Sequence, residues 1–542
     1  MRLSGRTRAG ERGWWLRLAP ALGLVVVLAA CADEAADDEQ PEDDDATEVE
    51  DAEEEPDDAD VDESADELRV VLPREPATLD PVHAVVSDAT VFGAFLEPLI
   101  RPDAGMEPTS EGLIVDWEQV DDVTWHFEVR EGVEFHNGEP FNADAVAWNI
   151  LNNRDSEGIL TQYFGPIAEA VALDETTVEV ITNEPNNSLV PLFMIIHAIP
   201  PDYYEEVGSE GFDEAPVGTG PYVYDGRELG QSMTAVANPD YWDGEVGVER
   251  ITWNFTADAS TRANLLVTDA VDVEFDVAFE ALDTLLEAEE VGVEPYEDSL
   301  EKVSLFVTAN QPPMDDRDLR EAVARAIDYD LIVAELFEGE GVERSRNLLD
   351  TGAAGATEEH GYDYSPEEAE QLVAQYDGDP TVQLSPITDR GPRGEEVGEA
   401  LASMLENVGF QVERNPLPYG DFVELALTQN LPGVYMHPKT SLAPDPFFWA
   451  SGFLTSFSLT KHCSEGLYDE YDALAAEALA QPSAGEAAAV YTELDELALT
   501  QDVCVIPLYN VVKHWASSVP VDGLEMRSDG IPVTFADLEV QR

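Results

Sequence analysis

Residues 125–146, WHFEVREGVEFHNGEPFNADAV, combine three structural signals in one short stretch. Trp125 and Phe127 alternate with polar residues, which is the period of a half-buried strand. Asn137-Gly138 predicts a tight turn, because both residue types tolerate positive φ. Asn142 follows as a candidate helix N-cap. The stretch therefore predicts a strand, a turn and a capped helix, with the aromatic side chains of the strand in the core.

A second ordered stretch lies in the C-terminal half of the chain. Residues 382–384 are typical of a buried strand, and residues 395–408 carry an apolar stripe at helical spacing that ends at Gly409. Residues 410–412 then begin another strand, so the stretch predicts a βαβ unit and a parallel sheet. Residues 365–368, SPEE, predict another helix, with Ser365 as its capping residue. These elements indicate an α/β protein with mixed sheets.

Five segments, taken in order, resemble family 5 extracellular solute-binding proteins, which are the peptide-, nickel- and opine-type receptors of bacterial ABC importers. In the second of them, Gly218 is expected to permit a turn. The five segments are residues 125–146, 215–222 (APVGTGPY), 238–242 (NPDYW), 312–322 (PPMDDRDLREA) and 364–369 (YSPEEA).

The resemblance implies a type II fold like that of periplasmic binding proteins, with two lobes built from three discontinuous domains. It implies capture of a peptide-like or other small organic solute between hinged lobes, delivery to the permease subunits of an ABC transporter, and neither a catalytic step nor a cofactor. A secreted hydrolase acting on a small solute is the alternative. The resemblance places domain I at 68–114, 218–310 and 514–542, domain II at 115–217 and domain III at 311–513, with hinges near Pro216-Val217 and Val512-Lys513.

Candidate ligand-binding residues follow from the same resemblance. Nickel-type relatives place a pocket aromatic residue at the position of Tyr163, and Phe448 and Trp449 either line the cleft or pack in the core. Asp445 precedes a proline, so it either contacts the solute or forms a turn. Residues 441–443, SLA, replace an aspartate that peptide-binding relatives carry, which argues against a dipeptide ligand. The remaining candidates are Ser87, Thr90, Tyr435 and His437.

The N-terminus carries features of an exported, lipid-anchored protein. Five arginines precede the apolar run 18–30, which is too short to span a bilayer and is typical of a signal peptide. Leu28-Ala29-Ala30-Cys31 resembles the lipobox of bacterial lipoproteins, so residues 1–30 are the expected leader and Cys31 the expected lipidation site. The protein is therefore expected outside the cytoplasm, attached to the membrane through acyl chains on Cys31.

Acidic residues dominate the composition. The chain holds 115 Asp or Glu and 27 Lys or Arg, for a formal net charge of -88. Residues 31–67 are expected to be a disordered acidic tether, because they lack the apolar residues needed for a core. The charge makes nucleic acid a poor partner, since the two surfaces would repel each other. It also predicts a salt-adapted, halophilic protein, because screening cations reduce self-repulsion.

Three cysteines limit the covalent chemistry. With Cys31 lipidated, Cys463 and Cys504 remain as a pair that either forms a disulfide or stays as two buried thiols. The eight histidines show no metal-ligand spacing, and neither do the cysteines. The sequence therefore predicts no metal site.

Overall fold

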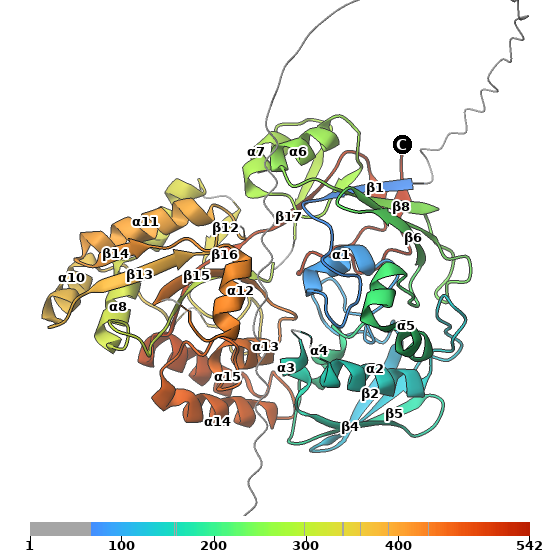
Figure 1. The fold of residues 1–542 in the computed structure, drawn as a ribbon, viewed down its shortest axis with the longest axis horizontal. Helices are drawn as coiled ribbons and strands as arrows, with labels where there is room; N and C mark the ends of the chain where they lie inside the picture. Colours follow the sequence, from blue (N-terminus) through green and yellow to red (C-terminus); the bar gives the residue numbers. More distant parts are fainter. Residues whose placement is uncertain are drawn as a thin grey trace, which may run out of the picture. The chain divides into compact units, whose positions relative to one another are not determined.

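The computed structural model describes residues 67–542 apart from residues 157, 159, 297, 298, 339, 340, 358, 389 and 432. The expected leader, Cys31 and all of the expected tether except Glu67 lie outside the described residues. Three sheets of four or more strands organise the described part of the chain (Figure 1). Helices alternate with these strands, which confirms the predicted α/β class with mixed sheets.

A seven-stranded sheet, in the order β10-β17-β9-β1-β8-β7-β6, begins with β1 (Glu67–Leu72). β1 pairs in parallel with β8 and β9, whereas β7 pairs antiparallel with both β6 and β8. The other elements of this region are β6 (Tyr222–Glu228), β7 (Ser232–Ala237), β8 (Arg250–Phe255), β9 (Val273–Glu274), β10 (Gly292–Pro295), β17 (His514–Ser517), η1 (Val86–Asp88), α1 (Ala89–Phe92), α6 (Ala259–Val267), α7 (Phe279–Leu286) and the short pair β18 (Val521–Asp522) and β19 (Glu539–Val540).

A four-stranded antiparallel sheet, in the order β2-β3-β5-β4, contains the strand predicted at the start of residues 125–146. β3 (Thr124–Val129) buries Trp125 and Phe127, and α2 (Ala143–Asp155) starts where Asn142 Oδ1 accepts a hydrogen bond from Ala145 N at 3.0 Å. The predicted strand and capped helix are confirmed. The other elements are β2 (Ile114–Asp121), β4 (Ile167–Ala172), β5 (Thr177–Thr182), α3 (Thr161–Phe164), α4 (Leu189–Phe193) and α5 (Pro201–Glu214).

A six-stranded sheet, in the order β12-β16-β11-β15-β13-β14, contains the predicted βαβ unit. β13 (Thr381–Pro386) and β14 (Gln411–Arg414) are parallel neighbours joined through α11 (Gly394–Asn407), so that prediction is confirmed. The predicted helix at Pro366 is α10 (Pro366–Gln375), but the Ser365 side chain makes no capping hydrogen bond, so the predicted cap is wrong.

The remaining elements of this region include three short π-helical segments, η2, η3 and η5. These elements are β11 (Glu301–Val307), β12 (Val342–Arg344), β15 (Val434–Thr440), β16 (Val505–Val511), α8 (Arg317–Ala326), α9 (Tyr329–Leu331), η2 (Ile332–Leu336), α12 (Tyr419–Leu427), α13 (Pro446–Trp449), η3 (Ala450–Leu454), η4 (Glu465–Leu467), α14 (Tyr468–Leu479), α15 (Ala488–Glu496) and η5 (Leu497–Gln501).

Strand pairing changes one proposed domain boundary. The proposed domain I includes residues 301–310, but β11 pairs with β15 and β16 inside the six-stranded sheet. The chain therefore crosses between the seven-stranded and six-stranded sheets at residues 296–300 and again at residues 512–513. The second of these crossings includes Val512-Lys513, while Pro216-Val217 lies on a different connection, between α5 and β6. Both hinges remain predictions.

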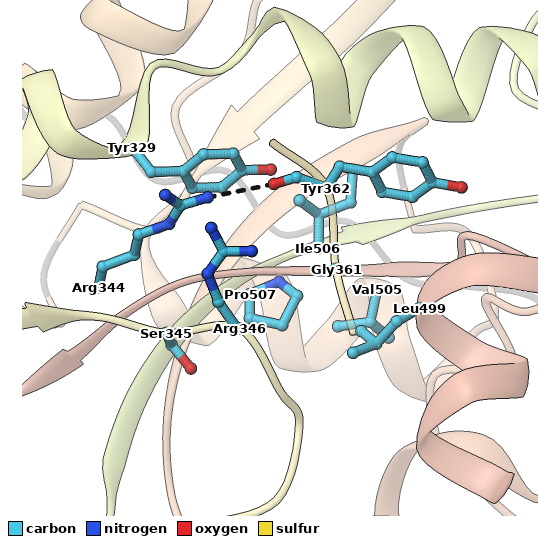
Figure 2. Close-up of a pocket in the computed structure, with 10 residues that line it drawn as sticks. All are labelled: Tyr329, Arg344, Ser345, Arg346, Gly361, Tyr362, Leu499, Val505, Ile506 and Pro507. Atoms are coloured by element: carbon cyan, nitrogen blue, oxygen red, sulfur yellow. Dashed lines mark hydrogen bonds between the residues drawn. The ribbon is translucent and has the colours of Figure 1, made fainter. Parts of the chain in front are cut away.

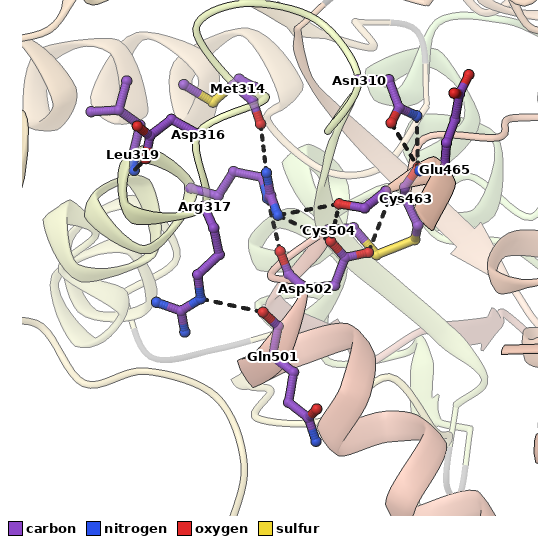
Figure 3. Close-up of polar contacts among 12 residues, drawn as sticks. Asn310, Met314, Asp316, Arg317, Leu319, Cys463, Glu465, Gln501, Asp502 and Cys504 are labelled. Carbon is purple, nitrogen blue, oxygen red and sulfur yellow. Dashed lines mark hydrogen bonds and ion pairs between the residues drawn. A yellow bond between two sulfur atoms is a disulfide. The ribbon is translucent and has the colours of Figure 1, made fainter. Parts of the chain in front are cut away.

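Cys463 and Cys504 form a disulfide with an S–S distance of 2.09 Å. The disulfide lies beside Asp502 (Figure 3). The Asp502 carboxylate forms a buried ion pair with the Arg320 guanidinium at 3.0 Å. The same carboxylate accepts a hydrogen bond from Ser464 N at 3.0 Å. The disulfide and the Asp502 contacts together tie the loop before η4 to the chain that enters β16.

In the described part of the chain, no helix has the length and apolar character needed to cross a bilayer.

Candidate functional site

One face of the strand pair β11–β15 carries the polar and aromatic residues of the candidate site. In the antiparallel register Lys302 lies opposite Lys439, Ser304 opposite His437, and Phe306 opposite Tyr435. The intervening residues Val303, Leu305, Val434 and Met436 belong to a separate hydrophobic core on the other face of the sheet. Strand alternation therefore directs two lysines, a histidine and two aromatic rings to the same side of the sheet.

Aromatic rings cover this face. Phe306 stacks on Tyr435 with ring centroids 5.4 Å apart, and Phe453 of η3 lies 5.0 Å from Phe306. His437 lies 4.7 Å from Phe422 of α12, and Trp449 of α13 lies 5.2 Å from Phe453. We call these six side chains, Phe306, Phe422, Tyr435, His437, Trp449 and Phe453, the aromatic cluster. Tyr435, His437 and Trp449 were among the sequence candidates, and the structure brings them together.

Two cations stand against aromatic rings in and beside the cluster. Lys439 Nζ is 3.6 Å from the centroid of the Trp449 ring, and Arg390 Cζ is 3.7 Å from the centroid of the Tyr419 ring. Neither forms an ion pair with a carboxylate among the described residues. Such contacts are attractive because the face of an aromatic ring is electronegative.

Burial controls the charge states in the cluster. Burial, with smaller contributions from the charges of Arg390 and Lys439, lowers the pKa of His437 to about 3, so this imidazole is neutral at pH 7. Burial lowers the pKa of Lys439 to about 7, although the Asp350 carboxylate raises it in part. Burial also raises the pKa of Asp350. The aromatic cluster thus contains a neutral imidazole, and beside it lies the Lys439 ammonium, which titrates near neutral pH.

Ser87 and Thr90 belong to the seven-stranded region, at the start of α1. Ser87 is exposed, and the Thr90 hydroxyl donates a hydrogen bond to the Ser87 carbonyl at 3.0 Å. Between them lies Asp88, whose carboxylate is 2.7 Å from Arg74. Burial raises the pKa of Asp88, while the charges of Arg74 and Arg390 oppose that shift. The charge of Arg390 therefore acts both on Asp88, beside α1, and on His437, in the aromatic cluster.

The other three candidates form a separate contact with the four-stranded region. The ring of Tyr163 in α3 lies 5.3 Å from Phe448, and Ser188 donates a 3.2 Å hydrogen bond to Asp445. Asp445 also caps α13 by accepting from Phe447 N at 2.8 Å, so its side chain has the turn role that the sequence left open. Burial raises the pKa of Asp445 to about 6. The structure thus places Tyr163, Asp445 and Phe448 in packing between regions.

A cavity beside β12 and β16 of the six-stranded sheet is too small for an organic solute. Tyr329, Arg344, Arg346 and Tyr362 are among the residues that line it (Figure 2). Its volume is about 10 Å³, which is room for roughly one water molecule. Figure 2 shows Arg344 beneath the Tyr329 ring, where the guanidinium carbon is 4.7 Å from the ring centroid. This cavity is therefore not a candidate solute site.

Metal ligation has one candidate in the described ranges. His462, Cys463 and Cys504 bring ligand atoms within 4.8 Å of one another. The two sulfur atoms are bonded to each other, so neither is available as a thiolate ligand in this state.

Sequence reasoning missed Arg390, Lys439 and Asp350. One signal was available for Lys439, because the chain has only four lysines and this one interrupts the apolar strand sequence VYMHPKT. A charged residue in a buried strand is unusual enough to mark a site for attention. No comparable signal existed for Arg390 and Asp350, which lie in loops.

Comparison with known proteins supplies the family. Residues 109–460 match the family model described as "Bacterial extracellular solute-binding proteins, family 5 Middle". The chain belongs to family 5 of the bacterial extracellular solute-binding proteins.

Two relatives illustrate the solutes named for proteins similar to this family 5 chain. Glutathione-binding protein GsiB of Escherichia coli K12 is 30% identical over 310 residues, which are 55% of this chain and 59% of that protein. The chain thus spans less than two thirds of this relative. Heme-binding protein A of Haemophilus influenzae is 25% identical over 455 residues, which are 76% of this chain and 81% of that protein.

A solved structure shows the shared fold. The dipeptide-binding protein of Pseudoalteromonas sp. SM9913, in complex with Met-Leu, has a TM-score of 0.77 and 20% identity. The match covers 88% of this chain and 100% of that structure.

Proposed function

We propose that this family 5 protein is a non-enzymatic receptor that captures an organic solute between two lobes and delivers it to an ABC permease. One lobe would carry the seven-stranded and four-stranded sheets and the other the six-stranded sheet. The observation that carries the proposal is the aromatic cluster with Lys439 and Arg390, because apolar walls with a few placed polar groups are typical of solute sites.

The two crossings at residues 296–300 and 512–513 support a hinge in this proposal. In the described part of the chain these two short connections link the seven-stranded and six-stranded sheets, so rotation there would separate the lobes with little change inside either one. Lys513 lies at the second crossing, 3.1 Å from Glu301 at the start of β11 and 3.6 Å from Asp276. This ammonium links groups from both sides of the proposed hinge.

A melting screen with organic solutes tests the receptor function. Glutathione, dipeptides such as Met-Leu, hemin and nickel–histidine are suitable probes, because relatives and solved structures are named for such solutes. A bound solute at about 100 times its Kd should stabilise the protein by about 2.7 kcal/mol. Failure of every probe and of native mass spectrometry with growth-medium extract to show a complex would contradict the proposal, and turnover of a probe would favour the hydrolase.

We also propose that acyl chains on Cys31 attach the receptor to the outer face of the membrane, where it would meet its permease. The apolar leader and the lipobox-like sequence before Cys31 support this localisation. Wild-type protein should fractionate with membranes, whereas Cys31→Ser should not acquire the lipid. Equal lipid content in the two proteins, measured by mass spectrometry, would contradict the anchor without bearing on solute binding.

A further inference from the structure

Lys302 and Lys439 are cross-strand neighbours with different surroundings. Lys302 Nζ donates to the Asn347 carbonyl at 2.8 Å, to Asn347 Oδ1 at 3.0 Å and to the Leu349 carbonyl at 2.7 Å. An ammonium has three N–H groups, so these bonds use the whole donor capacity of Lys302. Lys302 therefore has a structural role in holding the loop that leads to Asp350.

Lys439 has no such set of acceptors. Its ammonium has one polar contact, with Ser441 Oγ at 3.4 Å, and otherwise faces the rings of Trp449 and Phe453. Two of its three N–H groups thus have no acceptor among the described residues. The side chain is only 9% exposed. Leaving a buried charged donor unpaired is unfavourable, so this position favours a ligand that supplies negative charge.

None of the carboxylates that the structure describes pairs directly with the Lys439 ammonium. Asp350 attracts it, but the Asp350 carboxylate accepts from Trp449 Nε1 at 3.3 Å and is not within ion-pair distance of Lys439. Lys302 lies across the strand pair, His437 is two residues away on the same face and neutral, and Arg390 lies near His437. Asp350 thus stabilises the Lys439 ammonium without pairing with it, and Lys302 opposes the charge, so a direct anionic partner would stabilise the ammonium further.

Lys439 also stands near the surface that would face the other lobe. It precedes the segment whose Asp445 and Phe448 contact the four-stranded region, and Phe453 beside it is only partly buried. We propose that the Lys439 ammonium, held on the Trp449 ring, binds a carboxylate or similar small anionic group of the transported solute. This inference rests on the proposed receptor function and assigns the solute to the class of organic acids.

Matched pairs of free acid and ester test the inference. The acid and ester pairs are glutathione and its diester, Met-Leu and its methyl ester, and hemin and its dimethyl ester. Each probe is titrated against wild type, Lys439→Met, Lys439→Arg and the exposed control Lys461→Met. Wild type and Lys461→Met should prefer the free acid, and Lys439→Met should bind that acid about 100-fold more weakly, as expected for loss of one partner of a buried charge pair. Lys439→Met should still fold, because an apolar side chain of similar length fills the site.

Proton linkage separates a direct contact from a structural role. A bound anion stabilises the protonated amine, so wild type should take up protons on binding at pH 8, and its affinity should fall as pH rises above about 7. Lys439→Arg should bind without that proton uptake, because guanidinium stays charged. Calorimetry in two buffers with different ionisation enthalpies measures the uptake.

Each outcome supports or overturns the inference. Equal binding of acid and ester by wild type, or an unchanged acid preference in Lys439→Met, overturns it while the receptor function stands. Lys439-dependent stabilisation by sodium chloride or formate alone, with solute binding unaffected by the substitution, assigns the site to an inorganic anion and also overturns it. If no probe binds and medium extract yields no complex, the receptor function fails and the anion site fails with it.

Discussion

The Asp445 carboxylate lies where α13 meets the four-stranded region, with Ser188 and Phe447 N as its donors. Burial there raises its pKa, because the charged form loses more hydration than the neutral form. The protonated carboxyl is thus favoured by folding. Stability contributed by this group is complete below the unfolded pKa and is lost as pH rises toward the folded pKa of about 6.

Asp445→Asn should remove this pH dependence while keeping a side chain that can cap α13. Between about pH 3 and pH 7 the wild type should lose about 3 kcal/mol relative to the variant, from a pKa of 3.8 in the unfolded chain and about 6 in the folded one. Urea unfolding at several pH values measures the difference. Asp258→Asn, at an exposed cap of α6 where hydrogen bonding lowers the pKa, is the control and should not show this loss. If the free energy of unfolding changes with pH equally in wild type and Asp445→Asn, the raised pKa of Asp445 is contradicted.

Gly218 shows how a residue choice can depend on a distant backbone. The sequence predicts a turn role, but Gly218 does not have positive φ. A Cβ at this position would lie 2.0 Å from the Phe95 carbonyl oxygen, so close packing excludes any larger residue. The turn interpretation of Gly218 is therefore wrong. No local pattern could reveal this requirement, because Phe95 belongs to another part of the chain.

At the scale of elements, α2 and α10 differ in whether the predicted N-cap hydrogen bond forms. Asn142 accepts from Ala145 N at the start of α2, whereas Ser365 makes no side-chain bond at the start of α10. Pro366 supplies the first helical residue of α10 and has no N–H to satisfy. The two helices therefore depend on different features of their first turns.

Alanine substitutions at these two caps should have unequal effects. Asn142→Ala should lower the free energy of unfolding by about 1 kcal/mol, because a backbone N–H loses its acceptor. Ser365→Ala should leave stability almost unchanged, since no bond is lost. Thermal or urea unfolding measures both. A larger loss for Ser365→Ala than for Asn142→Ala would contradict the assignment of the caps.

The disulfide constrains a group of helices in the C-terminal part of the chain. It closes a loop of sequence separation 41 that contains α14, α15 and η5. Removing a cross-link of that separation should lower the free energy of unfolding by about 4 kcal/mol, mainly by freeing the unfolded chain. A double variant with Cys463→Ala and Cys504→Ala tests this by urea unfolding, and reductant should destabilise the wild type but not the variant. Unchanged stability in the variant would mean that the cross-link constrains little.

At the scale of the whole molecule, charge is the dominant property. Residues 68–542 alone hold 92 acidic and 22 basic residues, a net charge of -70. Mutual repulsion opposes the compact state, and salt weakens it by shortening the Debye length from about 10 Å at 0.1 M to about 3 Å at 1 M. Buried pairs such as Arg320–Asp502 are less sensitive to salt than the exposed surface.

Thermal stability should therefore rise between about 0.1 M and 2 M KCl, a range in which screening changes strongly. Calorimetry measures the shift in Tm, and an equal osmolality of sorbitol controls for effects that do not involve charge. A Tm that is constant or falls across the KCl series would contradict salt adaptation.

The sequence determined the α/β class, the strand, turn and helix of residues 125–146, the βαβ unit of β13, α11 and β14, and the family. These features depend on periodicity and capping, which act between neighbours in the chain. Tertiary structure alone placed β11 in the six-stranded sheet and brought Arg390, His437 and Lys439 together from separate segments. Burial and unpaired charge exist only after distant strands and loops meet, so no local pattern contains them.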